Sequence, residues 1–129
     1  MSAQLHEDPC FDVGSEGCRI PLSDVAVIAL ARALLSEPDI LYIGQTLDYL
    51  SPQTNDKVFQ TLQRYVDERG LMGAGEDCSF ELRRKKLVVV ITKSPKVARY
   101  CSRHLALHMD GRIDVHEDVG QIDAKWNMS

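Results

Sequence analysis

The 129-residue sequence has no uninterrupted apolar run of roughly 18 residues, the length that a membrane-spanning helix needs. Its first ten residues, MSAQLHEDPC, are polar and acidic, so we expect no secretory signal peptide. The net charge is −4, with both signs interspersed. The sequence has no excess of basic residues of the kind that would predict nucleic-acid binding. The one cationic cluster, RRKK at residues 83–86, is typical of a solvated approach to a strand.

Cysteine pairs with metal or redox spacing are also lacking. The four cysteines are widely separated, at Cys10, Cys18, Cys78 and Cys101, and no C-x-x-C pair exists. With no secretory signal, reduced thiols in a cytosolic setting are the default expectation. His104 and His108 are expected to share one face of a strand, with Cys101 and His116 nearby, but no ligand pair has finger-like C-x₂-C spacing, so we predict no metal site.

The best-patterned stretch is residues 20–52, which reads as a helix, a break and a strand. Residues 25–35 are almost wholly apolar, which predicts a mostly buried helix, with Ser23 or Asp24 as its cap. Pro38 cannot continue a helix and ends it near Leu35. Residues 40–43, ILYI, predict a strand buried on both faces of a parallel sheet.

The remaining pattern completes an α/β fold. A second helix is expected at 53–69, a strand at 86–92, a short helix from Pro95 to about Cys101, and strands at 103–108 and 112–116 around an Asp110-Gly111 turn. We predict a three-stranded parallel core with flanking helices and a C-terminal β-hairpin. Residues 1–19 are expected to form a loop, 20–117 the folded part, and 118–129 a polar tail.

The stretch ALARALL at 29–35, followed by PDIL at 38–41, resembles the nucleotide-binding domain of ATP-binding cassette (ABC) transporters. In that family the strand is followed by a Pro-Thr-Ser-Ala-Leu-Asp-Pro loop, in whose place stands TLDYLSP at 46–52. The resemblance runs over about residues 22–113 and covers the C-terminal half of such a domain. It implies part of a P-loop NTPase-like sheet, ATP and Mg²⁺ as the family's ligands, and ATP-coupled transport.

The residues at the family's catalytic positions differ from the family pattern. Gly44 stands where the family has the Mg²⁺-binding Asp, and Gln45 where it has the catalytic Glu. An amide can hydrogen-bond a water but cannot take its proton at neutral pH. Lys93 stands in place of the switch His. The phosphate-cradling string Gly-x-x-x-x-Gly-Lys-Ser/Thr does not occur in these residues.

The family's two interface motifs also differ. Ser23 matches the Ser of the Leu-Ser-Gly-Gly-Gln signature and Asp24 follows it, but the glycines of the signature are replaced. Ser51 replaces the Asp of the D-loop. The candidate nucleotide-contacting residues are therefore Ser23, Asp24, Gln45, Ser51 and Lys93, with no intact catalytic set and no tightly bound ATP or Mg²⁺.

Three functional hypotheses follow. The first is a degenerate, non-catalytic half of an ABC ATP-binding domain that pairs with another such domain or with the missing N-terminal half. By resemblance it would contact a transporter membrane domain, from the cytoplasmic side. The second is a stand-alone soluble interaction module without nucleotide dependence. The third is an ATPase whose missing motifs are supplied in trans.

Overall fold

The computed structural model describes residue 15 and residues 19–71 and 80–117 of the 129. It divides into two units, Met1–Val90 and Ile91–Ser129, which are described separately below. Most of the expected loop at 1–19 and the whole expected tail at 118–129 lie outside the described residues. The first unit contains α2 (Leu22–Leu35), β1 (Ile40–Ile43), the 3-10 helix η2 (Gln45–Tyr49), α3 (Pro52–Asp67), the 3-10 turn η3 (Phe80–Leu82) and β2 (Leu87–Val90).

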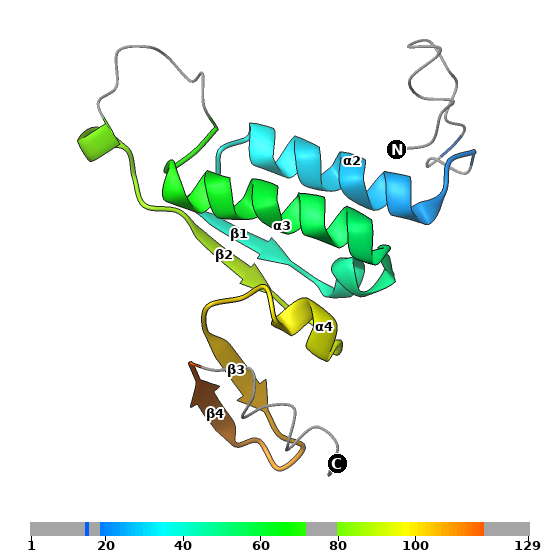
Figure 1. Ribbon diagram of the computed structural model, residues 1–129, viewed down its shortest axis with the longest axis vertical. Coiled ribbons are helices and arrows are strands. Elements are labelled where there is room, and N and C mark those ends of the chain that lie inside the picture. Colours follow the sequence, from blue (N-terminus) through cyan, green and yellow to red (C-terminus); the bar gives the residue numbers. More distant parts are fainter. Residues whose placement is uncertain (1–14, 16–18, 72–79, 118–129) are drawn as a thin grey trace. The chain divides into compact units, whose positions relative to one another are not determined.

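Strands β1 and β2 pair in parallel, in register from Ile40↔Leu87 to Ile43↔Val90 (Figure 1). The amide of Leu87 also donates to the carbonyl of Asp39, at 2.9 Å, just before β1. Helix α3 joins the two strands and packs against β2. The predicted strand–helix–strand unit is thus present, although β2 is shorter than the expected 86–92.

Helix α2 ends at Leu35, as Pro38 predicts, but its start differs from the sequence prediction. Pro21 is the N-cap, and its carbonyl accepts from the amides of Asp24 and Val25 at 2.9 and 3.1 Å. The prediction that Ser23 or Asp24 caps the helix was wrong, because the helix starts one residue earlier than Ser23 and both residues lie inside its first turn.

Helix α3 agrees with its pattern. The Ser51 hydroxyl caps it by accepting from the amide of Thr54 at 3.2 Å, and Pro52 occupies the first turn. The apolar residues of α3 recur at helical spacing, and of these Val58, Phe59, Leu62 and Tyr65 are buried, whereas Val66 is partly exposed. The chain leaves the helix through Gly70, whose φ of 133° is one that a side chain would resist.

Burial is one-sided, and here two predictions were wrong. Leu41 and Ile43 are buried, whereas Ile40 and Tyr42 are 66% and 63% exposed, so β1 is buried on one face only. Within α2 only Asp24 and Leu34 are buried. The apolar runs predicted a mostly buried helix and a strand buried on both faces, but the described residues of the first unit supply a single layer of α-helices, drawn above the strands in Figure 1.

The second unit contains α4 (Pro95–Ala98), β3 (His104–Leu107) and β4 (Ile113–His116). Strands β3 and β4 pair antiparallel and form a sheet of their own. The prediction of a three-stranded parallel core was therefore wrong for the described residues. Strands joined by a tight turn pair at a small loss of chain entropy, which favours the hairpin.

The hairpin turn lies one residue before the predicted Asp110-Gly111 pair. The amide of Gly111 donates to the carbonyl of His108 at 2.9 Å, which places Met109 and Asp110 at the centre of the turn. Gly111 has φ 84° and follows the turn, where a left-handed residue returns the chain to the strand.

Candidate functional site

The carboxyl end of β1 leads directly into Gly44 and Gln45. In open parallel sheets, ligands bind just beyond this end of the strands. Gly44 has an ordinary φ of −69°, and a Cβ added there would meet no atom within 4 Å. A Cβ atom fits at this position, so neither the backbone conformation nor a close contact at Cβ requires glycine.

Gln45 begins η2, and this short helix is anchored to α3. Leu47 is only 2% exposed, and the Asn55 side-chain amide donates to its carbonyl at 3.0 Å. Asn55 itself is buried, and its Oδ1 atom has no hydrogen-bond partner. Sequence reasoning missed Asn55. Its signal is a polar residue at helical spacing before the apolar pair Val58 and Phe59.

The other candidate residues have different local roles. Helix α2, which carries Ser23 and Asp24 in its first turn, contacts η2, so the elements bearing these residues and Gln45 meet. The Ser51 hydroxyl lies 2.9 Å from that of Thr54 and caps α3. Lys93 is exposed and belongs to the second unit.

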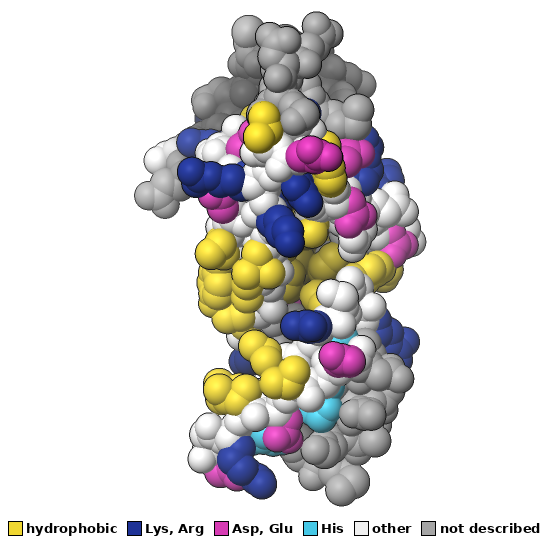
Figure 2. Space-filling view, turned by 90° about the vertical axis from the view of Figure 1, so that its left-hand side faces the viewer, with side chains coloured by type: hydrophobic (Ala, Val, Ile, Leu, Met, Phe, Trp, Pro, Cys, Tyr) yellow, Lys and Arg dark blue, Asp and Glu magenta, His cyan; other side chains and the backbone are white. Residues whose placement is uncertain are grey.

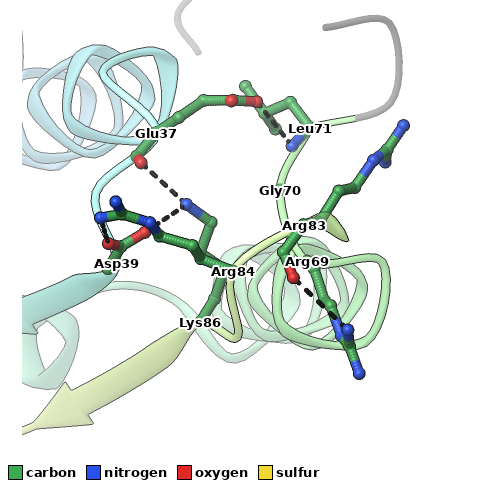
Figure 3. Close-up of a pocket in the computed structure, with 8 residues that line it drawn as sticks. All are labelled: Glu37, Asp39, Arg69, Gly70, Leu71, Arg83, Arg84 and Lys86. Atoms are coloured by element: carbon green, nitrogen blue, oxygen red, sulfur yellow. Dashed lines mark hydrogen bonds and ion pairs between the residues drawn. The ribbon is translucent and has the colours of Figure 1, made fainter. Parts of the chain in front are cut away.

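A cavity of about 190 Å³ opens at the amino ends of β1 and β2, away from Gly44 and Gln45 (Figure 3). Its walls come from the α2–β1 turn, the end of α3 and the approach to β2. The lining residues are Glu37, Asp39, Arg69, Gly70, Leu71, Arg83, Arg84 and Lys86. Four of these are cationic and two are anionic, so charge dominates this end of the unit.

Lys86 is the centre of this cluster. Its side chain is only 7% exposed, and its ammonium donates to the carbonyl of Glu37 at 2.9 Å and to Asp39 Oδ1 at 3.0 Å. Arg84 donates to the other Asp39 oxygen at 3.0 Å. The hydrogen bonds from Lys86 and then Arg84 lower the pKa of Asp39 below its usual value. The prediction of a solvated cationic run was therefore wrong for Lys86.

Tyr65 closes the cluster from the helix side. Its ring centroid lies 5.8 Å from the Lys86 ammonium, and its hydroxyl donates to the Pro38 carbonyl at 2.6 Å. Burial raises the pKa of Tyr65.

The remaining groups of the cavity bind backbone atoms. The Arg69 guanidinium donates to the carbonyls of Phe80 and Arg83 at 3.3 and 3.4 Å, and it lies 4.3 Å from the Phe80 ring centroid. Arg83 in turn donates to the Glu68 carbonyl at 3.3 Å. These two guanidinium groups point away from each other in Figure 3. These residues therefore form a network of polar contacts that joins the α2–β1 turn, the end of α3 and the approach to β2. We call this network, made by the residues that line the cavity together with Tyr65, the polar clasp.

The described part of the second unit contains three histidines and one cysteine. His104 lies opposite His116 in the hairpin, and its Nε2 atom is 2.7 Å from the Ala98 carbonyl. His108 pairs with Asp114 at 3.0 Å. Burial raises the pKa of the Cys101 thiol. Across residues 15, 19–71 and 80–117, no three His, Cys, Asp or Glu side chains are grouped to hold a metal ion.

Curated relatives of the chain are ATP-binding proteins of ABC transporters. The methionine import ATP-binding protein MetN 1 of Lactiplantibacillus plantarum is 28% identical over 95 residues, which are 74% of this chain and 22% of that protein. The lipoprotein-releasing system ATP-binding protein LolD of Geobacter metallireducens is 30% identical over 86 residues, 67% of this chain and 31% of LolD. The histidine/lysine/arginine/ornithine transport protein HisP of Salmonella typhimurium is 26% identical over 95 residues, which are 74% of this chain and 31% of HisP.

The class that these relatives define is the ATP-binding domain of ABC transporters, and this chain is related to it. More narrowly, the chain corresponds to a segment of such a domain, because it spans only 22–31% of the length of these three relatives. No protein-family model matches the chain. None of the helices in the part that the structure describes is long and apolar enough to cross a membrane.

Proposed function

We propose that the chain acts as a non-catalytic part of an ABC-type ATP-binding domain in ATP-coupled transmembrane transport. The observation that carries the proposal is the pair Gly44 and Gln45, directly after β1, in a chain related to ABC ATP-binding proteins. Neither residue offers a carboxylate to bind Mg²⁺ or to accept a proton from water.

The pattern of substitution supports this proposal. A Cβ atom added at Gly44 meets no atom within 4 Å, so the glycine is not imposed by a close approach at that position. The Ser51 hydroxyl, at the place of the family's interfacial carboxylate, is occupied by capping α3. Ser51 therefore stabilises the start of α3, and neither Ser51 nor Gly44 supplies the acidic group that hydrolysis needs.

The proposed partner is the remainder of an ABC-type ATP-binding domain or a second such domain. The chain spans under a third of LolD, and LolD is an ATP-binding protein of a lipoprotein-releasing system. By analogy with such relatives, we place the chain at the cytoplasmic side of a membrane, beside a transporter membrane domain. ATP and Mg²⁺ would be bound by the assembly, chiefly through residues outside this chain.

Calorimetry with MgATP tests the proposal. We expect a dissociation constant of about 1 mM or weaker for the isolated chain, because its sequence contains no Gly-x-x-x-x-Gly-Lys-Ser/Thr motif to hold phosphate. A dissociation constant in the low micromolar range that Gln45→Ala weakens would contradict the proposal. The control is Gln60→Ala, an exposed glutamine on α3.

A further inference from the structure

Residues 80–85, FELRRK, combine exposed apolar and cationic side chains in one short stretch of the first unit. Phe80 and Leu82, in the 3-10 turn η3, are 51% and 74% exposed. Lys85 is exposed, and the side chain of Arg84 is 83% exposed. We call residues 80–85 the basic–apolar segment.

The basic–apolar segment is positively charged, although the chain as a whole is acidic. It holds three consecutive cations at 83–85 and one anion, Glu81, so its formal charge is +2, whereas the whole chain carries −4. Arg69 adds a further cation beside it, because its guanidinium lies 4.3 Å from the Phe80 ring centroid. Figure 2 faces the side of the first unit on which η3 lies in Figure 1, and it shows Lys and Arg side chains next to apolar ones there.

The contacts of the arginines leave their guanidinium groups accessible. Arg84 pairs with Asp39, but an ion pair as exposed as this one contributes little and does not remove the guanidinium from solvent. Arg83 donates to the Glu68 carbonyl at 3.3 Å, which leaves other N–H groups of its guanidinium for a ligand.

Exposed apolar side chains next to Lys and Arg match the surface of an anionic bilayer. Cationic side chains attract anionic headgroups, while aromatic and aliphatic side chains enter the boundary between headgroups and acyl chains. A small soluble anion would use the cations alone and leave Phe80 and Leu82 in water. The segment brings both kinds of group together within six residues, which span at most about 20 Å, so one flat surface reaches all of them.

We propose that the basic–apolar segment binds the surface of a bilayer that contains anionic phospholipids. Phe80 and Leu82 insert at the headgroup boundary, and the cations at 83–85 bind the acidic groups of the lipids. The contact turns the amino ends of β1 and β2 towards the lipid. This inference goes beyond the proposed function and does not rest on it, because neither a nucleotide nor a second domain takes part.

Cosedimentation of the full chain with vesicles tests the proposal. One preparation is phosphatidylcholine alone, and the other contains about 30% phosphatidylserine, which supplies the negative surface potential. Apolar side chains elsewhere on the chain meet both preparations alike, so the difference between the two isolates the effect of charge.

Two variants change the segment at exposed positions, Lys85→Glu and Leu82→Ser. The control for the first is Lys57→Glu, which makes the same charge change at an exposed lysine of α3. The control for the second is Leu22→Ser on α2, where the leucine is 74% exposed, as Leu82 is.

We expect the wild-type chain to bind the phosphatidylserine vesicles at least about fivefold more tightly than phosphatidylcholine alone. Lys85→Glu should weaken binding to the anionic vesicles about tenfold and Leu82→Ser about threefold, whereas each control changes it less than about twofold. Raising NaCl from about 50 to 500 mM should weaken binding about tenfold, because salt screens the attraction.

Four results would overturn the proposal. Equal binding to both preparations would show apolar adsorption only. Binding that Lys85→Glu weakens and Leu82→Ser leaves unchanged would show a general polyanion site. Losses in the controls as large as those in the matched variants would place the contact elsewhere on the chain. Displacement by inorganic phosphate at constant ionic strength would assign the cations to a free anion. Calorimetry with MgATP contains no lipid, so the proposed function and this proposal fail separately.

Discussion

At the scale of single residues, Lys86 shows what a sequence pattern cannot distinguish. Within RRKK, Lys85 is exposed and Lys86 is buried, although the two side chains are chemically identical. The difference comes from the strand that follows, because neighbouring residues point in opposite directions. The direction in which Lys86 points depends on the pairing of β1 with β2, which joins residues far apart in sequence.

Replacing Lys86 should therefore destabilise the first unit. Lys86→Met removes the hydrogen bonds to Asp39 and to the Glu37 carbonyl, and we expect a loss of about 1–3 kcal/mol in the free energy of unfolding. Urea denaturation measures this loss. Lys85→Met is the matched control, with an expected change within about 0.5 kcal/mol. Equal losses in the two variants would refute the role given to Lys86.

Because of Asp39, the stability that this cluster contributes to the first unit depends on pH. Its pKa in the folded chain is lowered from 3.8, so the stability from its ionised form is present above that value. This stability is lost as the pH falls below 3.8 and passes through the lowered pKa. We predict that Asp39→Asn flattens the stability profile below about pH 4, measured by urea denaturation at successive pH values. An unchanged slope would rule out this contribution.

At the scale of elements, local sequence patterns predicted where most helices and strands lie. Which strands pair, and which faces are buried, was harder to predict. Both long helices, both parallel strands and the hairpin lie where periodicity, Pro38 and the Asp110-Gly111 region placed them, within a few residues. Burial on both faces of β1 was not correctly predicted, because an apolar run reports what a strand can bury and not what covers it. The prediction of a third parallel strand was wrong for a different reason: β3 pairs with β4, to which a tight turn joins it.

Ser51 tests whether the start of α3 serves structure or an interface. Ser51→Ala removes the cap on the Thr54 amide, and we expect a loss of about 1 kcal/mol in the free energy of unfolding. Ser51→Asp is the control, because aspartate caps a helix as well as serine does and also restores the carboxylate typical of the family. Thermal or urea denaturation compares the variants. Wild-type stability in Ser51→Ala would contradict the capping role.

At the scale of the whole molecule, the sequence showed the resemblance to part of an ABC ATP-binding domain. The structure added what lies at each end of the parallel sheet in the first unit. The resemblance placed Gly44 and Gln45 directly after a strand, and the structure has them there. The polar clasp at the opposite end, with Glu37, Lys86 and Tyr65, has no sequence motif. It assembles residues up to 49 positions apart, so only the folded chain brings it together.

The absence of catalysis by this chain is the central claim, and steady-state phosphate release with MgATP tests it most directly. We predict no release above background from the wild-type chain, because Gly44 and Gln45 supply no carboxylate. The double variant Gly44→Asp/Gln45→Glu should remain inactive, because the sequence contains no Gly-x-x-x-x-Gly-Lys-Ser/Thr motif to hold phosphate; a Cβ atom at position 44 meets no atom within 4 Å. Sustained turnover by the wild-type chain that Gln45→Ala abolishes would contradict the account.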